Sequence, residues 1–270
     1  MNRIYRIGIH AFLIVAALIA SFPFVWMVLT SLKTFQEYAL QQFFPSAPQW
    51  ANYTTAWDMA PFGRYLGNTL LIAVSATALV LITSSLAAYP FARVEFFGKE
   101  TVFTLFLTTL MIPFEMTMIP NFITIRNLEW IDRYPALIVP FSASVFGIFL
   151  LRQFFQQIPA DYYDAAVLDG AGHLQFLASI IVPLSRPALI SVGLFTFLGS
   201  WNALLWPLIV TNSEEMRLIQ VGLYAFVSEA GTNAHLLMAG SVIAVAPIIV
   251  LYFFAQKQFI EGISATGLRG

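Results

Sequence analysis

The sequence predicts an all-α membrane protein with six transmembrane helices, and three observations lead to this fold class. First, 59% of the 270 residues are hydrophobic and only 10% are charged, whereas a soluble domain carries about 25% charged residues. Second, six apolar segments are each long enough to approach or exceed the roughly 20 helical residues that cross a hydrocarbon core. Third, an isolated strand in lipid would leave its backbone polar groups without partners, so each segment is expected to be helical.

The six predicted spans are separated by polar or proline-rich loops. Pro23, Pro113, Pro140, Pro207 and Pro247 fall within spans, which bundled membrane helices tolerate because neighbouring groups satisfy the freed backbone. The predicted spans cover residues 8–32, 68–92, 101–120, 134–154, 186–210 and 235–256.

An even number of spans places both termini on one side of the membrane. With that side cytoplasmic, the inner loops hold eight of the 13 lysines and arginines and the outer loops hold five, which is the direction of the positive-inside rule. The first span is longer than a signal-peptide core and lacks a small-residue cleavage site, so we expect an uncleaved anchor. The chain is therefore predicted to be a single membrane domain, residues 1–270, with extracytoplasmic loops at 33–67, 121–133 and 211–234.

Composition and motifs exclude several kinds of function. The net charge of -1 does not indicate the excess of positive charge that is typical of nucleic-acid-binding proteins. The absence of cysteine excludes disulfides and thiolate metal sites. The Gly98-Lys99 pair is followed by Glu100 rather than by Ser or Thr, so it does not form a phosphate-binding loop. The three histidines have no ligand spacing around them. We therefore expect no catalytic, cofactor or metal site on this chain, and no enzyme activity.

The predicted cytoplasmic loop, residues 155–185, contains the most informative pattern in the chain. Pro159 followed by Asp161 indicates a helix start, with Asp161 capping free backbone amides. One face of this short helix is predicted to carry residues at positions i, i+3, i+4 and i+7, namely Tyr162, Ala165, Ala166 and Asp169. The two alanines would let this face approach a partner backbone closely.

The second half of this loop continues the pattern. Gly170 stands where a left-handed helix stop is usual. A second short helix from about His173 is expected to end before Pro183, which cannot continue the hydrogen-bond ladder. Two interpretations remain at this point: a helix–turn–helix that contacts a partner at the membrane surface, or an amphipathic connector between two spans.

The spacing resembles the E-A-A-x3-G-x9-I-x-L-P loop of ABC-importer permeases. Asp164 stands at the glutamate position and Val182 at the leucine position, and both are conservative departures from the family pattern. The other matching residues are Ala165, Ala166, Gly170, Ile180 and Pro183. Similarity to the carbohydrate-importer branch, and within it to the shorter permease of a maltose-type or glycerol-phosphate-type pair, extends to FVWMVLTSLKT, AAYPFARVEFFGK, LMIPFEMTMIP, FGIFLLRQFFQQIP, DGAG, SWNALLWPLIV and AQKQFIEGISATGLRG.

This resemblance implies a heteromeric complex in a bacterial-type plasma (inner) membrane. The partners would be membrane lipid, a homologous second permease, an extracytoplasmic solute-binding protein and two ATP-binding subunits, which would bind ATP and Mg. The helix at 164–170 would dock on an ATP-binding subunit as a coupling helix between the fourth and fifth spans. The terminal ATGLRG resembles tails that contact these subunits, although a frayed terminus is an equal alternative.

Polar residues in the spans are candidates for a substrate pathway. Ser200, Trp201 and Asn202 combine hydroxyl, aromatic and amide groups that suit sugar rings, and Glu115 is a carboxylate within a span. The alternatives are that polar groups join helices, that Glu115 lies wet near a span end, and that the partner permease holds the sugar. We expect a permease subunit of an ATP-driven importer for a sugar or oligosaccharide. The rival is a stand-alone secondary transporter or channel for a small polar solute.

Overall fold

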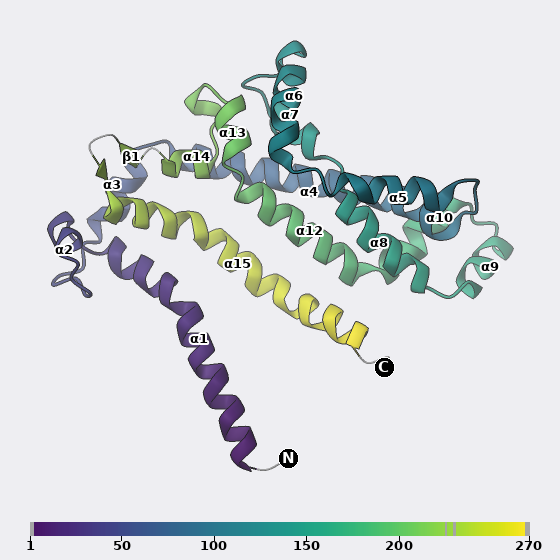
Figure 1. The fold of residues 1–270 in the computed structure, drawn as a ribbon, viewed down its shortest axis with the longest axis horizontal. Helices are drawn as coiled ribbons and strands as arrows, with labels where there is room; N and C mark the ends of the chain where they lie inside the picture. Colours follow the sequence, from purple (N-terminus) through teal and green to yellow (C-terminus); the bar gives the residue numbers. More distant parts are fainter. Residues whose placement is uncertain (1–2, 225, 229–230, 268–270) are drawn as a thin grey trace. The chain divides into compact units, whose positions relative to one another are not determined.

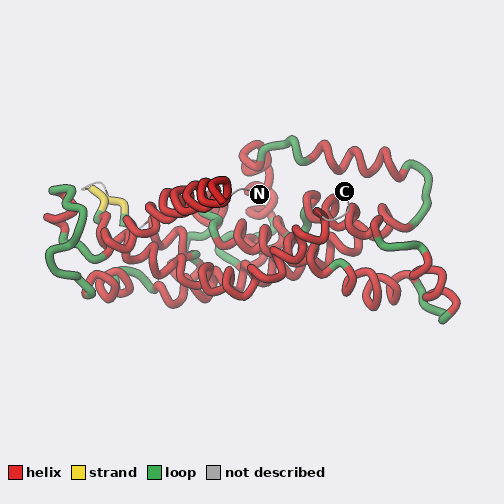
Figure 2. Tube along the Cα trace, turned by 90° about the horizontal axis from the view of Figure 1, so that it is seen from below, coloured by secondary structure: helices red, strands yellow, loops and turns green. Residues whose placement is uncertain are grey.

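The computed structural model describes residues 3–224, 226–228 and 231–267. Figure 1 shows the helices, labelled and coloured along the sequence. The chain divides into two compact units. Unit 1 comprises Met1–Gly63 and Val221–Pro247, and unit 2 comprises Arg64–Gln220 and Ile248–Gly270. Within the described residues the fold is helical apart from one antiparallel pair of two-residue strands, drawn in yellow in Figure 2. The predicted all-α class is therefore confirmed.

Unit 1 contains the beginning and part of the end of the chain. The long helix α1 is followed by two short helices, and the strand pair precedes the last helix. Its elements are α1 (Arg3–Ser31), α2 (Phe35–Ala39), α3 (Ala51–Asp58), β1 (Val227–Ser228) and β2 (Gly231–Thr232), together with the first residues of α4 (Phe62–Arg93), the last residues of α14 (Ile219–Tyr224) and the first part of α15 (Ala234–Gly267).

The segment after α1 is ordered by polar contacts. Asn52 Nδ2 donates to the carbonyl oxygens of Ser31 and Lys33, both at 2.8 Å. The Glu37 carboxylate accepts the backbone amides of Thr34 and Ser46 at 2.8 Å each, and these bonds lower the pKa of Glu37 to about 2. The loop after the first span is thus fixed to the end of α1 by local chemistry.

Unit 2 holds the middle of the chain and both candidate sites. It is built from the remainder of α4, the first residues of α14, the last part of α15 and a series of shorter helices. These are α5 (Lys99–Thr109), α6 (Phe114–Asn127), α7 (Tyr134–Ile138), η1 (Val139–Phe141), α8 (Val145–Gln157), α9 (Asp161–Leu168), α10 (His173–Phe176), η2 (Leu177–Ile181), α11 (Val182–Leu184), α12 (Arg186–Trp201), α13 (Leu205–Val210) and η3 (Glu214–Met216).

The described residues include three continuous helices that are long and apolar enough to cross a membrane. These cover Ile7–Ser31, Phe62–Arg93 and Ala234–Phe253, and they match the first, second and sixth predicted spans. Three further candidates are bent helix pairs, so the number of spans reaches six if each pair is one span. The expected number of apolar crossings is therefore compatible with the structure, although half of them are not straight helices.

Three predicted spans are interrupted in the structure rather than continuous helices. The third breaks where α5 ends and α6 begins, with a bend of 92°, because Pro113 takes an extended conformation and restarts the helix as its N-cap. The fifth ends at Trp201 and resumes only at Leu205. The fourth also bends, by 43°, between Phe141 and Val145.

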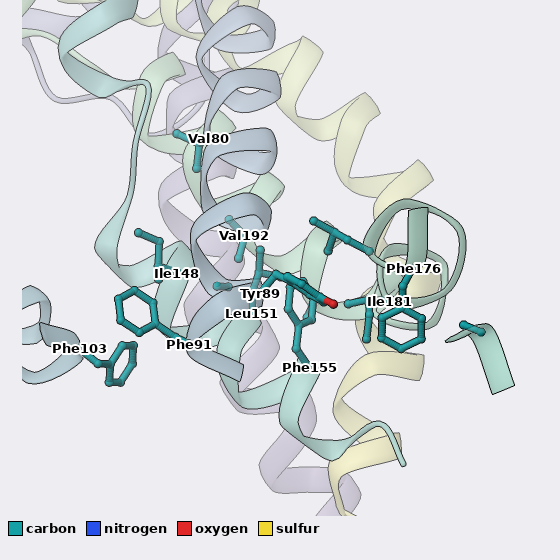
Figure 3. Close-up of a cluster of buried hydrophobic side chains, with 14 residues drawn as sticks. Val80, Tyr89, Phe91, Phe103, Ile148, Leu151, Phe155, Phe176, Ile181 and Val192 are labelled. Atoms are coloured by element: carbon teal, nitrogen blue, oxygen red, sulfur yellow. The ribbon is translucent and has the colours of Figure 1, made fainter. Parts of the chain in front are cut away.

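Unit 2 has two hydrophobic cores. The first, which we call the α9-end core, joins α4, α5, α8, α9, α10 and α12, and Figure 3 shows Tyr89, Phe91, Phe155 and Phe176 directed into it. The second, the α13-end core, gathers Ile72, Ile125, Leu137, Trp206 and neighbouring apolar residues. These two cores position the two candidate sites.

Candidate functional site

The first candidate site is the exposed side of α9. The helix begins at Asp161, as predicted, but Asp161 is its first residue rather than its cap. The N-cap is Ala160, and no side chain caps the helix. The carboxylates of Asp161 and Asp164 lie in the first turn, where they favour the positive end of the helix.

The end of α9 forms the expected left-handed stop. Gly170 has φ of 81°, a conformation that glycine adopts without the steric penalty of a side chain. The amide of Ala171 donates to the carbonyl of Ala166 at 2.8 Å, and the amide of Gly170 donates to that of Val167 at 3.0 Å. This is the paired hydrogen bonding of a Schellman motif, so the turn is set by the local sequence.

The faces of α9 differ in exposure from the prediction. Ala165 and Asp164 are exposed, but Ala166 is only 5% exposed and packs into the α9-end core. Of the two alanines on the predicted face, only Ala165 is open to a partner, because the helix uses Ala166 to approach its own bundle. The exposed side instead presents Leu168 at 89% and, after the turn, Leu174 at 71%.

An aromatic and hydrogen-bonded contact fastens α9 to the end of α4. Nδ1 of His173 and the hydroxyl of Tyr89 are hydrogen-bonded at 2.7 Å. The imidazole ring of His173 stacks on Tyr163 of α9, with 5.6 Å between centroids, and Phe176 meets both tyrosines edge-on. His173 was predicted only as a helix start, and its spacing from Tyr89 along the chain gave no signal of this contact.

Pro183 does not end the second helix of the loop, contrary to the prediction. The chain remains helical from His173 to Leu184, with a π-helical turn at Leu177–Ile181 immediately before the proline. A widened turn relieves the clash that a proline ring makes with the carbonyl one turn earlier. The helix ends at Ser185, and α12 then departs at an angle of 83°.

Two arginines connect the helix ends that lie next to α9. Arg152 Nε donates to the carbonyl of Phe91 at 3.1 Å and Nη2 to Glu100 Oε1 at 2.6 Å. Arg93 Nη2 donates to the carbonyl oxygens of Phe155 and Ile158 at the end of α8. These bonds join the ends of α4, α5 and α8 immediately before α9.

The second candidate site is a partly open cavity of about 350 Å³ in unit 2. Its walls come from α4, α7, η1, α8, α12 and α13, and from the breaks before α8 and after α12. Aromatic rings occupy two walls: Phe141 and Trp206 meet edge-on at 6.1 Å, and Phe146 and Phe195 at 5.8 Å. Three lining residues carry a side-chain hydroxyl group: Ser144, Thr196 and Ser200.

The structure separates the four predicted pathway residues. Only Ser200 lines the cavity. Trp201 is 2% exposed and stacks on Phe197, with 5.5 Å between ring centroids. Asn202 is exposed at the end of α12, and Glu115 is exposed in the first turn of α6, away from the cavity lining.

Sequence reasoning missed most of the cavity. Ser144 caps α8 by accepting the amide of Gly147 at 3.1 Å, and a serine before an apolar run is a recognised helix-start signal. The prediction of a single span over residues 134–154 hid this signal.

The described residues contain no group of three His, Cys, Asp or Glu side chains that could hold a metal. Of the predicted C-terminal contact segment, Leu268 to Gly270 lie outside the described residues.

Comparison with known proteins adds a family match. The family model described as "Binding-protein-dependent transport system inner membrane component" matches residues 81–264. The arabinooligosaccharides transport system permease protein AraQ of Bacillus subtilis is 34% identical over 99% of this chain and 97% of its own length. The diacetylchitobiose uptake system permease protein NgcG of Streptomyces coelicolor is 30% identical over 94% of this chain and 86% of its length.

A solved structure shares the fold. It belongs to a bacterial ABC transporter involved in the import of the acidic polysaccharide alginate, and one of its chains superposes with a TM-score of 0.82. The two sequences are 25% identical, and the match covers 95% of this chain and 97% of the other.

Proposed function

Because the chain belongs to the family of binding-protein-dependent transport system inner membrane components, we propose that it is a membrane-spanning subunit of an ATP-driven ABC importer for a sugar or oligosaccharide. The observation that carries this proposal is the nearly full-length similarity to permeases for oligosaccharides. The chain forms half of the translocation pathway and acts in the bacterial inner membrane as one domain, residues 1–270. Its rival, a stand-alone secondary transporter or channel, is disfavoured by membership of a family that depends on a binding protein.

The proposed partners follow from this role. A homologous second permease supplies the other half of the pathway, and an extracytoplasmic solute-binding protein delivers the cargo. Two ATP-binding subunits hold ATP and Mg on the cytoplasmic side, where both termini of this chain lie. The loops at 33–67, 121–133 and 211–234 then face the binding protein or the outer lipid surface.

We place the coupling contact at α9. Asp164 and Ala165 are exposed on a helix whose other side is packed into the α9-end core, so a subunit that moves against α9 would move the bundle as well. Leu168 offers an apolar surface and Asp164 a carboxylate for a charge-assisted hydrogen bond. Ala166, Gly170 and Pro183 act in this proposal by shaping the helix and its turn, rather than by direct contact.

The substrate pathway is proposed at α12 and the break that follows it. Ser200 reaches the cavity directly, whereas Trp201 and Asn202 mark the break itself. Glu115 lies at the corresponding break before α6. Interrupted helices near a pathway expose backbone groups that can bind a polar cargo.

The proposal is tested by purifying the chain from its native membrane in mild detergent. We expect a second permease and an ATP-binding subunit to co-elute, with ATP hydrolysis and ATP-driven sugar uptake after reconstitution into liposomes. A chain that elutes alone and moves solute without ATP would overturn the importer and restore its rival.

A matched pair of glycine variants tests the coupling role of α9. Gly170 and Gly98 both have positive φ, 81° and 77°, and a Cβ added at either glycine would meet no atom within 4 Å, so aspartate strains both backbones alike. We expect Gly170→Asp to abolish transport with the chain still inserted, and Gly98→Asp to retain it. Equal transport by the two variants would contradict the coupling role.

A further inference from the structure

We propose that the cavity of unit 2 holds one ring of an uncharged sugar, so that this chain itself contacts the cargo and selects a neutral one. This inference rests on the proposed importer function and names the substrate class of its pathway. The cavity measures about 350 Å³, at the lower end of the roughly 300–1,000 Å³ that is usual for small-molecule sites. It therefore suits a single ring of a longer cargo.

The shape of the lining fits a sugar ring. A pyranose or furanose ring has apolar C–H faces and a rim of hydroxyl groups, so it needs apolar walls with a few hydrogen-bonding groups. Phe141 and Phe146 belong to two different aromatic pairs in the walls. Ser200 and Ser144 supply hydroxyls from two different segments.

The hydroxyls of the lining differ in their freedom to bind a cargo. Thr196 Oγ1 is engaged with the carbonyl of Val192 at 2.9 Å, and Ser144 Oγ accepts the amide of Gly147. The hydroxyl of Ser200 has no hydrogen-bond partner in the described part of the chain. Ser200 is therefore the side chain we assign to hydrogen bonding with the sugar.

The electrostatics of the lining favour a neutral cargo. The described residues that line the cavity are aliphatic, aromatic or hydroxyl-bearing, and none of them is charged. A phosphate or carboxylate entering such a lining would lose hydration without gaining a cation or a set of donors. A neutral ring loses far less, because its hydroxyls can bond to the serine hydroxyls of the lining.

Gly199 provides a direct way to fill the cavity. It lines the cavity, and a Cβ added there would meet no atom within 4 Å. A leucine at this position would project into the cavity without a clash at its base. Gly67 is the matched control, because it is also a helical glycine with open space around the added Cβ but lies outside the lining.

The test uses the complete complex reconstituted in liposomes with its solute-binding protein. ATP-driven uptake is measured for two neutral probes, arabinotriose and di-N-acetylchitobiose, and one anionic probe, trigalacturonate. We expect uptake of a neutral probe and at least a tenfold preference over the anion. For that probe, Gly199→Leu should lower uptake at least tenfold, whereas Gly67→Leu should leave it unchanged.

A second pair of variants removes a hydroxyl instead of adding bulk. Ser200→Ala should lower neutral-sugar uptake several-fold, whereas Ser191→Ala should not, because Ser191 on the same helix bonds to the carbonyl of Pro187 and lies outside the lining. This pair keeps the proposal testable if Gly199→Leu fails to assemble.

Three outcomes would overturn the inference. They are equal uptake by both variants of the serine pair, preferred uptake of trigalacturonate, and no uptake of either neutral probe. All three differ from failure of the proposed function, in which the complex shows neither co-purified ATP-binding subunits nor ATP hydrolysis.

Discussion

The two hydrophobic cores of unit 2 differ in the hydrogen bonds that hold their helices together. At the α9-end core, the guanidinium groups of Arg93 and Arg152 donate to backbone carbonyls, and Arg152 also pairs with Glu100. At the α13-end core, the main fastenings are neutral: Trp206 Nε1 donates to the carbonyl of Ala136 at 2.8 Å, and Asn68 Nδ2 donates to that of Glu215 at 2.7 Å. Buried guanidinium groups therefore concentrate at one core, while the other core relies mainly on neutral donors and the lining of the adjoining cavity carries no charged side chain.

This difference matches the role that each region is proposed to have. Bonds from a charged donor are stronger than neutral ones, so the helices behind α9 are held firmly enough to transmit a displacement. A fixed charge beside the cavity would instead bind or repel ionic cargo. The two cores thus combine a stiff base for a partner subunit with an uncharged surface for a sugar, within one compact unit.

Removing the buried guanidinium of Arg152 is expected to destabilise the complex most. Arg152→Ala removes bonds to Phe91 and Glu100 and the stacking of the guanidinium over Phe103, whose ring centroid is 4.0 Å from Arg152 Cζ. Because Arg152 is buried while Glu100 is largely exposed, we expect a loss of about 2–3 kcal/mol, mainly from the unpaired carbonyl and the vacated space. The measurement is the apparent Tm of the purified complex.

Two controls sharpen the result for Arg152. Glu100→Gln should destabilise less, because its side chain is 69% exposed and water can replace the arginine. Arg126→Ala should have little effect, because Arg126 is exposed on α6. A Tm for Arg152→Ala equal to that of Arg126→Ala would show that the charged fastening contributes nothing to the α9-end core.

The α9 region was the part most accessible to prediction from the sequence. Its start, its left-handed stop at Gly170 and its length depend on interactions between residues that are close in the sequence. The spacing of residue types along the chain is therefore enough to predict them. The direction of Ala166 did not follow from the spacing, because both alanines lie on neighbouring positions of one helix face and only the position of the bundle decides which is buried. The role of His173 was missed for a similar reason, since its partner Tyr89 is distant in the sequence.

The second prediction concerns the helix crossing between the α9-end core and the cavity. A Cβ on Gly147 would lie 2.7 Å from Ser84 Oγ and 3.1 Å from a methyl group of Val192. Gly147→Ala should therefore destabilise the complex by about 1–3 kcal/mol through overpacking, measured again as the apparent Tm. Adding Ser84→Ala removes the nearest atom and should restore part of the loss.

A matched helical glycine separates packing from helix propensity. Gly193 faces ordinary contacts of 3.5 Å or more, so Gly193→Ala should be neutral or mildly stabilising. If Gly147→Ala behaved in the same way, α4, α8 and α12 could separate freely at this crossing.

The cavity itself could not have been predicted from the sequence. Hydropathy reports how long an apolar segment is, but it does not report where a helix turns, so the breaks at 110–113 and 202–204 were absorbed into predicted spans. Prolines inside membrane helices are tolerated often enough that Pro113 alone was a weak signal. Ser200 was identified as polar within a span, but its neighbours in space, Ser144 and Phe141, come from a different segment of the chain.

The mildest of the predicted effects concerns a charged contact beside the α13-end core, that of Asp132. Asp132 Oδ1 accepts the amides of Asn212 and Ser213 at 2.9 and 3.0 Å. Partial burial opposes ionisation, but these hydrogen bonds and the charge of Arg217 prevail, so the pKa of Asp132 lies below its usual 3.8. A lowered pKa in the folded state means that the stabilisation is present above pH 3.8 and is lost as the pH falls through the folded-state pKa.

Asp132→Asn keeps an acceptor oxygen and tolerates the positive φ of 62° at this position, but it cannot ionise. We expect it to lower stability by about 1 kcal/mol at pH 7, with the difference in apparent Tm from the wild type shrinking as the pH falls through the lowered pKa of Asp132. Asp58→Asn, at an exposed carboxylate in unit 1, should show no such convergence. A difference for Asp132→Asn that stays constant with pH would mean that the two loops are joined by hydrogen-bond geometry alone, and that ionisation of the Asp132 carboxylate adds nothing to the stability of this contact.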